Sequence, residues 1–290
     1  MNNYIATPSR TKEIMKKHHF SVKKSLGQNF LIDVNILTHI IDAAGIDENA
    51  NVIEIGPGIG SLTEQLALRA KKVVAFEIDQ RLKPVLESTL KPYDNIKIIF
   101  EDILKSNLKE VIKNEFSPGE KIHIVANLPY YITTPILLRL LHDQLPIDTM
   151  TVMMQKEVAE RMAAEPNTKA YGSLTIAVQY YTNAEIVMDV PKTVFLPQPN
   201  VMSSVLHLDL KEKKDIDVED EELFFAIIRA SFVHRRKTIL NNLGVHYQDE
   251  LTKTELKNIL TEAGIDPQRR GESLSIQDFA ILANVFSKKL

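Results

Sequence analysis

The fold is decided by the stretch Asn51-Val52-Ile53-Glu54-Ile55-Gly56-Pro57-Gly58-Ile59-Gly60. Its first half is mostly apolar and predicts a buried strand, and the residues that follow the glycines predict a helix over Ser61–Arg69. The glycines allow a tight turn and a close approach of the backbone to a nucleotide-like ligand. The turn would equally suit a dinucleotide site, but its spacing is G-x-G-x-G rather than G-x-G-x-x-G, so the ligand need not carry a pyrophosphate.

Outward from this stretch, short apolar runs alternate with helical patterns as far as residue 142. Alternation of this kind predicts a parallel sheet with helices on both faces. The predicted strands are Asn51–Ile55, Lys72–Ile78, Ile96–Phe100 and Ile122–Ala126, and the predicted helices are Ser61–Arg69, Arg81–Leu90 and Leu108–Phe116.

The pattern changes after residue 142. A predicted strand at Thr149–Met154 and a helix at Ser173–Tyr181 precede two strands, Ala184–Val190 and Ser204–Leu210, that have no helix between them. The stretch between these two strands is rich in proline. We therefore expect a long hairpin here, with one strand running antiparallel at the edge of the sheet.

The last part of the chain, from Lys211 onward, is charged and then helical. Its predicted helices have apolar residues at a spacing close to 3.6 and are Glu222–Phe232, Lys237–Leu243, Lys253–Ala263 and Ile276–Phe286. The third begins with a capping box, Thr252 to Glu255, and ends before Gly264. We predict an α/β domain over residues 1–210, with a basic N-terminal extension, and a small all-helical domain over residues 211–290.

Composition limits the class of protein further. A chain of 290 residues is long enough for one large domain and a small one. It has no long uncharged apolar run and no apolar segment within Met1–Phe20, so neither a membrane span nor a secretory signal is expected. Cysteine is absent, which excludes disulfides and thiolate metal sites. We expect a cytoplasmic monomer that binds no metal and no membrane.

The net charge of −3 argues against a uniformly basic nucleic-acid binder, so the distribution of charge matters more than its sum. Basic residues gather in three clusters, each of which is equally well explained as solvated surface. The clusters are Lys12, Lys16, Lys17, Lys23 and Lys24; Arg229, Arg235, Arg236 and Lys237; and Arg269 with Arg270.

Acidic residues follow the second and third predicted strands. Ligands of open parallel sheets bind at the carboxyl ends of the strands. Glu77 stands roughly 20 residues after the glycine loop, where an acid accepts hydrogen bonds from ribose hydroxyls, and Asp79 is the alternative. After the third strand, Asp102 is preferred to Glu101 because strand alternation turns it to the same side as Phe100, and it would accept from the exocyclic amine of an adenine.

Asn127-Leu128-Pro129-Tyr130 follows the fourth predicted strand. It brings together an amide side chain, a backbone carbonyl and an aromatic ring. The exocyclic amine of adenine is a poor nucleophile because its lone pair is delocalised into the ring. Two acceptors on its N–H bonds would favour a pyramidal, reactive nitrogen, and the ring would hold the face of the base. With Gly56, Glu77 and Asp102, Asn127 completes a set at four strand ends.

These motifs resemble the ribosomal RNA adenine N6-dimethyltransferases, specifically the bacterial small-subunit enzymes, and the resemblance runs almost from end to end. The matching segments are Lys24-Ser25-Leu26-Gly27-Gln28-Asn29-Phe30-Leu31, Glu54 to Gly60 with Leu62-Thr63, Glu77-Ile78-Asp79, Asp102, Asn127 to Tyr130, Phe195-Leu196-Pro197-Gln198-Pro199-Asn200-Val201, Arg236-Lys237-Thr238 and Arg270-Gly271-Glu272-Ser273-Leu274-Ser275. The family often carries a different small residue at position 271.

The resemblance implies a Rossmann-like sheet that binds S-adenosyl-L-methionine, and it implies roles for particular residues. Asn29 and Leu31 would contact the methionine part of the cofactor, and Gly56 would line it. Glu77 would hold the ribose and Asp102 the adenine amine, and Asn127 would touch both the cofactor and the target amine. The target base would lie between Tyr130 and Phe195, with Asn127 and the carbonyl of Leu128 on its amine.

The implied activity is dimethylation of the N6 amines of two adjacent adenines in the 3′-terminal hairpin loop of small-subunit (16S) ribosomal RNA, within an immature 30S-type particle. RNA contacts would come from Lys23, Lys24, Arg235, Arg236 and Lys237. The alternatives are a related large-subunit ribosomal RNA methyltransferase and a ribosome-assembly factor in which methylation is secondary. A DNA adenine methyltransferase or an oxidoreductase fits the motifs less well.

Overall fold

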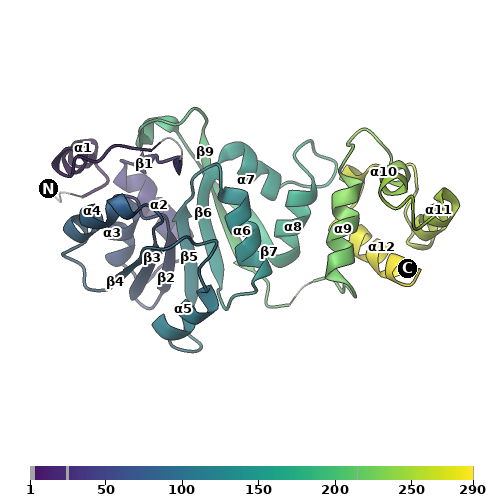
Figure 1. Ribbon diagram of the computed structural model, residues 1–290, viewed down its shortest axis with the longest axis horizontal. Helices are drawn as coiled ribbons and strands as arrows, with labels where there is room; N and C mark the ends of the chain where they lie inside the picture. The colour runs from purple at the N-terminus through teal and green to yellow at the C-terminus, as the bar shows by residue number, and fades with distance from the viewer. Residues whose placement is uncertain (1–3, 24–25, 214, 290) are drawn as a thin grey trace. The chain divides into compact units, whose positions relative to one another are not determined.

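The computed structural model describes residues 4–23, 26–213 and 215–289. The chain divides into two compact units (Figure 1). The first unit, here the sheet unit, comprises Met1–Ala159 and Ala184–Leu210, and the second, here the helical unit, comprises Glu160–Asn183 and Lys211–Leu290.

The sheet unit is built on one seven-stranded sheet with the strand order β4-β3-β2-β5-β6-β9-β7. Its strands are β2 (Asn51–Ile55), β3 (Lys72–Phe76), β4 (Ile96–Ile99), β5 (Ile122–Asn127), β6 (Thr149–Gln155), β7 (Thr182–Val190) and β9 (Ser203–Leu210). Strands β2 to β6 pair in parallel, and β9 runs antiparallel to β6. The predicted mostly parallel sheet with an antiparallel strand at its edge is confirmed: β9 is the antiparallel strand, and β7 lies beyond it as the outermost strand.

Helices cover both faces of this sheet. They are α2 (Val34–Ala43), α3 (Ser61–Ala67), α4 (Lys83–Thr89), α5 (Leu108–Glu115) and α6 (Thr133–His142). Apolar residues of α2 and α3 pack with the sheet in one buried cluster. Parallel strands are joined by right-handed crossovers. The chain moves outward from β2 to β4 and then back toward β5 and β6, so α5 and α6 cover the face opposite α3 and α4.

Two features that involve the N-terminal segment of the sheet unit were not predicted. A helix, α1 (Pro8–Lys17), begins at Thr7, whose side chain accepts from the backbone of Arg10. A two-stranded ribbon joins β1 (Phe30–Leu31) to β8 (Phe195–Leu196) in antiparallel register. The ribbon ties the N-terminal segment to the proline-rich stretch before β9.

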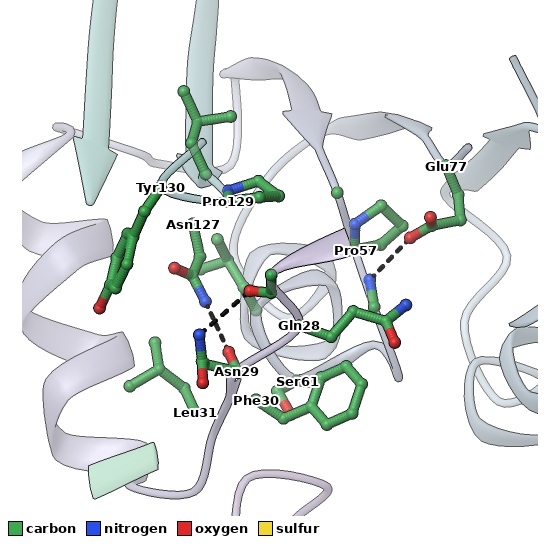
Figure 2. Close-up of a pocket in the computed structure, with 15 residues that line it drawn as sticks. Gln28, Asn29, Phe30, Leu31, Pro57, Ser61, Glu77, Asn127, Pro129 and Tyr130 are labelled. Carbon is green, nitrogen blue, oxygen red and sulfur yellow. Dashed lines mark hydrogen bonds between the residues drawn. The ribbon is translucent and has the colours of Figure 1, made fainter. Parts of the chain in front are cut away.

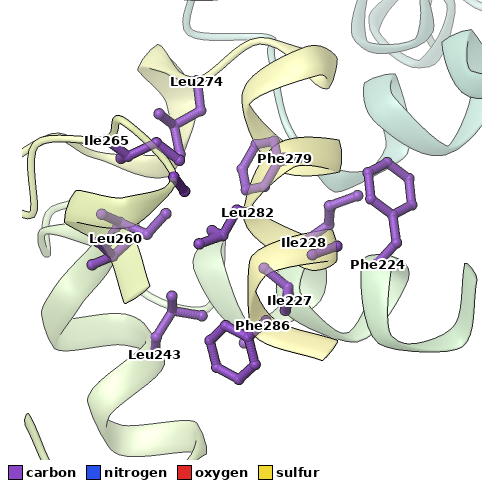
Figure 3. Packing of buried hydrophobic residues seen from close by; sticks show 14 of the residues in the cluster. Phe224, Ile227, Ile228, Leu243, Leu260, Ile265, Leu274, Phe279, Leu282 and Phe286 are labelled. Atoms are coloured by element: carbon purple, nitrogen blue, oxygen red, sulfur yellow. The ribbon is translucent and has the colours of Figure 1, made fainter. Parts of the chain in front are cut away.

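The helical unit packs around an apolar core (Figure 3). Its main helices are α8 (Ser173–Tyr181), α9 (Glu221–Ser231), α10 (Ile239–His246), α11 (Lys253–Glu262) and α12 (Ile276–Ser287). Helix α11 begins with the predicted capping box of Thr252 and Glu255. Gly264 follows the end of the helix with a φ of +73°, a left-handed conformation that is common just after a helix and that glycine adopts readily. Among the described residues, no helix is long and apolar enough to cross a membrane.

Residues 160–183 pack with the helical unit, although the sequence analysis placed them before the boundary at residue 210. The reason is aromatic packing. The ring of Tyr180, on α8, lies 5.1 Å from that of Phe224 and 5.4 Å from that of Phe225, both on α9. Helix α8 therefore belongs with the helices that follow it later in the chain. Helix α7 (Lys156–Met162) spans the point where the first unit gives way to the second.

Candidate functional site

A pocket lies at the carboxyl ends of β2, β3 and β5, where open parallel sheets bind their ligands (Figure 2). It is lined by residues 27–31, by the glycine loop and the first turn of α3, by Glu77, and by residues 127–130. Its space, with the open mouth included, measures about 670 Å³. The lining combines glycine backbone, a carboxylate and an amide side chain, which are polar groups of the kind that orient a ligand in a binding site.

The glycines of the loop are required mainly by its backbone, since Gly56, Gly58 and Gly60 have φ values of +74°, +60° and +95°, which residues with side chains rarely adopt. A side-chain carbon added at Gly58 would lie 2.9 Å from the ring of Phe30. At Gly56 an added carbon would lie 3.9 Å from the backbone oxygen of Asn127, so a side chain would fill the space that the two segments enclose. The loop therefore brings bare backbone to the ligand, as the sequence predicted.

Glu77 is buried beside the loop and carries its carboxylate into the pocket wall (Figure 2). One oxygen accepts from the amide of Gly58 at 3.1 Å and the other from the amide of Asp79 at 2.8 Å. Burial raises the pKa of Glu77 to about 6, although these two hydrogen bonds oppose the rise. The carboxylate is thus fixed at the strand end, in position to accept from hydroxyl groups of a ligand.

Asp79, the alternative to Glu77, is engaged elsewhere. Its carboxylate pairs with Arg81 at 2.6 Å and accepts from the amide of Gln28 at 2.9 Å. It does not line the pocket, whereas Gln28 does. Asp79 therefore holds the N-terminal wall of the pocket in place, and the geometry favours Glu77 as the ligand-facing acid.

Asn127 ends β5 and connects two walls of the pocket (Figure 2). Its side-chain nitrogen donates to the backbone oxygen of Asn29 at 3.3 Å, and the side-chain nitrogen of Asn29 donates to the oxygen of Gly27 at 3.0 Å. The contact turns the amide oxygen of Asn127 toward Tyr130. Leu31 lines the same pocket from β1. The structure thus brings together Asn29, Leu31, Gly56, Glu77 and Asn127.

Asp102 lies just past β4 and does not line this pocket. One of its oxygens accepts from the amide of Leu104 at 3.0 Å, which closes a turn before α5. β4 nevertheless lies beside β3, and the amide of Glu77 donates to the oxygen of Ile99 at 3.0 Å. Asp102 therefore follows the end of β4, which lies next to the end of β3 that Glu77 follows.

Tyr130 lies on the other side of Asn127 from Glu77 (Figure 2), and Leu128 also lines the pocket. The amide of Leu128 donates to the oxygen of Met153 on β6, which fixes the start of the loop. The hydroxyl of Tyr130 forms a hydrogen bond of 2.7 Å with the hydroxyl of Ser203. Sequence reasoning missed Ser203, because nothing local in the sequence signals a contact across 73 positions.

Phe195, which was predicted to lie opposite Tyr130 across the target base, does not line the pocket. Only 2% of the residue is exposed, and it packs in the apolar cluster of the sheet unit that also contains Leu31. Its strand, β8, pairs with β1 so that Phe195 lies opposite Leu31. Burial of this apolar ring is favourable because it removes apolar surface from water, and the pairing of β8 with β1 holds the ring in its buried position. In this structure Phe195 supports the wall that carries Leu31.

Glu54 is a second buried carboxyl that the sequence analysis did not single out. It is the residue before the last in the five-residue strand β2, and only 1% of it is exposed. Burial raises its pKa to about 8, and the nearby charge of Glu77 adds to the rise. The Glu54 carboxyl is therefore largely protonated at neutral pH, directly behind the glycine loop.

The predicted RNA-contacting residues fall in both units. Lys24 lies outside the described residues, and Lys23 is exposed beside the N-terminal wall of the pocket, where its amide donates to the side-chain oxygen of Gln28. In the helical unit, Arg235 and Arg236 line a shallow surface hollow together with Lys169 and Arg270. Lys237 follows them and is exposed.

The fold and the site together define a Rossmann-like methyltransferase that uses S-adenosylmethionine. The model of the family described as ribosomal RNA adenine dimethylase matches residues 19–282. The chain belongs to this family. The assignment agrees with the motifs at the strand ends, since the matched region contains every residue that lines the pocket.

Named proteins and solved structures agree with the family. A protein of Anoxybacillus flavithermus named ribosomal RNA small subunit methyltransferase A is 62% identical over 280 residues, which cover 96% of this chain and 95% of that protein. The crystal structure of a dimethyladenosine transferase from Plasmodium falciparum has a TM-score of 0.74 at 28% identity and covers 90% of this chain and 98% of that one. The 23S rRNA methyltransferase ErmE has a TM-score of 0.64 at 25% identity, with coverage of 89% and 99%.

Proposed function

We propose that this protein transfers methyl groups from S-adenosylmethionine to the N6 amines of two adjacent adenines in the 3′-terminal hairpin loop of small-subunit ribosomal RNA, giving N6,N6-dimethyladenosines. The observation that carries the proposal is the position of Asn127, which is shared between the wall formed by Asn29 and the loop that carries Tyr130. A donor pocket and an amine-binding loop therefore meet at one side chain. The name of the 62% identical relative supports the small subunit as the source of the RNA.

The pocket fits S-adenosylmethionine by the chemistry of its walls. Glu77 presents a fixed carboxylate for the ribose hydroxyls, and Gly56 leaves open the space that a side chain would fill. Asn29 and Leu31 form the side where the methionine part would lie, and Asp102, at the next strand end, is proposed to accept from the adenine amine. When bound, S-adenosylmethionine supplies a methyl group on a positively charged sulfur.

The chain's own residues act on the target amine. The side-chain oxygen of Asn127, turned toward Tyr130, and the carbonyl of Leu128 accept from its N–H bonds and favour a pyramidal nitrogen. Tyr130 supports one face of the base, and stacking of this kind is typically worth about 1–3 kcal/mol. That offsets part of the few kcal/mol typically needed to extrude a nucleotide.

Positioning supplies most of the acceleration. Bound S-adenosylmethionine would supply the methyl group, and Asn127 with the carbonyl of Leu128 would hold the amine nitrogen that receives it. Acceptors aimed at the positive charge that develops on nitrogen add electrostatic stabilisation. The amine proton leaves to water after transfer, so no residue of the chain is assigned as a general base. Because the second methylation uses the product of the first, the space beside Asn127 must admit one methyl group.

The substrate is proposed to be RNA within an immature 30S-type particle, methylated in the cytoplasm by a monomer. The catalytic role belongs to the sheet unit and a phosphate-contacting role to the helical unit. Arg235, Arg236 and Lys237 would contact phosphates there, and Lys23 would do so near the pocket. Structured RNA is recognised mainly through shape and phosphates, which suits basic surface residues.

The proposal is tested by transfer of labelled methyl groups from S-adenosylmethionine to immature small subunits and, in a separate reaction, to large-subunit RNA, followed by primer-extension mapping of the modified positions. We expect label in two adjacent adenines near the 3′ end of the small-subunit RNA. Label in large-subunit RNA instead would overturn the choice of substrate and favour the activity of ErmE, a 23S rRNA methyltransferase whose structure this chain also resembles. Absence of transfer to either RNA would overturn the proposed function as a whole.

A further inference from the structure

We propose that Ser203 is a positioning residue for methyl transfer, whose hydroxyl holds the ring of Tyr130 at the angle at which it meets the target base. The inference deepens the proposed function and depends on it, because only there does Tyr130 support a base. Ser203 does not line the pocket and would touch neither the base nor the methyl donor. It would act entirely through Tyr130.

Ser203 is a fixed point of the fold. It is the first residue of β9, it is fully buried, and it pairs with Gln155 at the end of β6. The amide of Lys156 donates to the oxygen of Met202, one residue before it, at 3.0 Å. The serine hydroxyl is therefore held by the sheet itself, and side chains supported by packed strands are placed more accurately than those on loops.

Tyr130, in contrast, lies in the loop between β5 and α6. The loop is anchored before it by Leu128, whose amide donates to Met153, and after it by Ile132, whose amide donates to Pro129. Neither anchor sets the direction of the Tyr130 ring. The hydrogen bond of 2.7 Å joins the far end of that ring to Ser203 and so fixes its direction.

The hydrogen bond between Tyr130 and Ser203 does not depend on pH near neutrality. Burial raises the pKa of Tyr130 above its usual value near 10, although the contact with Ser203 opposes the rise. The phenol therefore stays neutral and protonated at neutral pH. A neutral hydroxyl both donates and accepts, so it can pair with another hydroxyl in either sense.

Ser204 offers a matched control. It is the next residue of the same strand and is also fully buried, but successive side chains of a strand point to opposite faces. Its hydroxyl donates to Asp189 at 2.7 Å, away from Tyr130. Ser204→Ala thus removes a buried hydroxyl and its hydrogen bond from the neighbouring position without changing the contact to Tyr130.

The experiment measures single-turnover methyl transfer to immature small subunits by the wild type, Ser203→Ala, Tyr130→Phe, the double variant and Ser204→Ala. A hydrogen bond of this kind typically changes a rate by about fivefold to tenfold. We expect such a loss in each single variant at Ser203 and Tyr130, and no further loss in the double variant. Ser204→Ala keeps the wild-type rate, and all variants keep wild-type affinity for S-adenosylmethionine and for the particle.

Three results would overturn the inference. One is a wild-type rate in Ser203→Ala or in Tyr130→Phe. Another is a loss from Ser203→Ala that is equally large in the Tyr130→Phe background, since coupled residues must be non-additive. A third is an equal loss in Ser204→Ala, which would point to a general effect on the fold. If Ser203→Ala does not fold, the Tyr130→Phe rate alone decides. Failure of the wild type to methylate RNA would instead count against the proposed function.

Discussion

The two units of this protein bury different kinds of side chain. The sheet unit buries acids beside its pocket, with Glu54 1% and Glu77 5% exposed. The core of the helical unit is apolar and aromatic, and among the described residues none of its Asp or Glu side chains is buried to that degree. Its arginines and lysines lie at the surface, as around the hollow that Arg235 and Arg236 line.

The difference separates buried residues that stabilise the fold from buried residues that shape the binding pocket. Burying a carboxyl group costs stability unless it is hydrogen-bonded or protonated. The sheet unit limits that cost because Glu54 is protonated and Glu77 accepts two backbone hydrogen bonds, and it gains a fixed carboxylate in the wall of its pocket. The helical unit has no such cost, and its arginine and lysine side chains lie at the surface, where they can contact a partner. Changes in the two units should therefore have separable effects.

The largest expected effect is on stability, in the helical unit. Phe279 is fully buried in its core, on α12, and replacing a buried phenylalanine by alanine typically costs about 3–5 kcal/mol. Phe279→Ala should lower the free energy of unfolding by that amount in a denaturant titration. Ile281, on the same helix, is 50% exposed, so Ile281→Ala should change it little. Equal effects of the two substitutions would contradict the packing of this core.

The next largest effect is on cofactor affinity, in the sheet unit. Glu77→Ala removes the charged acceptor proposed for the ribose hydroxyls. A hydrogen bond to such an acceptor is typically worth about 1.5–3 kcal/mol, so binding of S-adenosylmethionine should weaken about 10- to 100-fold in calorimetry. Asp79→Ala, which acts only through Gln28 and Arg81, should weaken it less. A larger loss in Asp79→Ala would transfer the ribose-binding role to Asp79.

A pH effect should come from Glu54. Its pKa is about 8 in the folded protein against 4.5 for the ordinary group, so the folded state binds the proton more tightly than the unfolded state. The resulting stabilisation is fully present below about pH 4.5 and is lost as the pH rises through about 8. Glu54→Gln cannot ionise. The melting temperature of the wild type, relative to that of this variant, should therefore fall steadily from pH 5 to pH 9, and a constant difference would contradict the buried carboxyl.

The smallest expected effect is on RNA binding. Arg236 lines the surface hollow of the helical unit, and loss of one phosphate contact should reduce the slope of log affinity against log salt by about 0.7–0.9. Arg236→Ala should thus bind small-subunit RNA more weakly at low salt, with wild-type affinity for S-adenosylmethionine. Lys257→Ala, on α11, is an exposed control that should leave the slope unchanged. An unchanged slope in Arg236→Ala would remove this hollow from the RNA surface.

Much of the sheet unit was predictable because its signals are local. The strand before the glycine loop, the loop itself and the position of Glu77 follow from short-range pattern, and the structure places Gly56, Glu77 and Asn127 in one pocket. The capping box at Thr252 is local too and was found where predicted.

What could not be predicted depends on contacts between distant parts of the chain. The burial of Phe195 follows from the pairing of β8 with β1, and an aromatic residue in a proline-rich stretch gives no sign of that partner. The link from Tyr130 to Ser203 and the packing of Tyr180 on Phe224 are of the same kind. The raised pKa of Glu54 also needs the fold, because burial causes it.

The central claim is that Asn127 joins the donor pocket to the target amine, and the single-turnover rate of Asn127→Ala on immature small subunits tests it most directly. Loss of an oriented acceptor in such a site typically lowers a rate by about 100- to 1,000-fold. We expect that loss with the fold and the RNA affinity retained. Asn107→Ala, which removes an amide of equal size from the N-cap of α5, should keep the wild-type rate. A near-wild-type rate in Asn127→Ala would contradict the account.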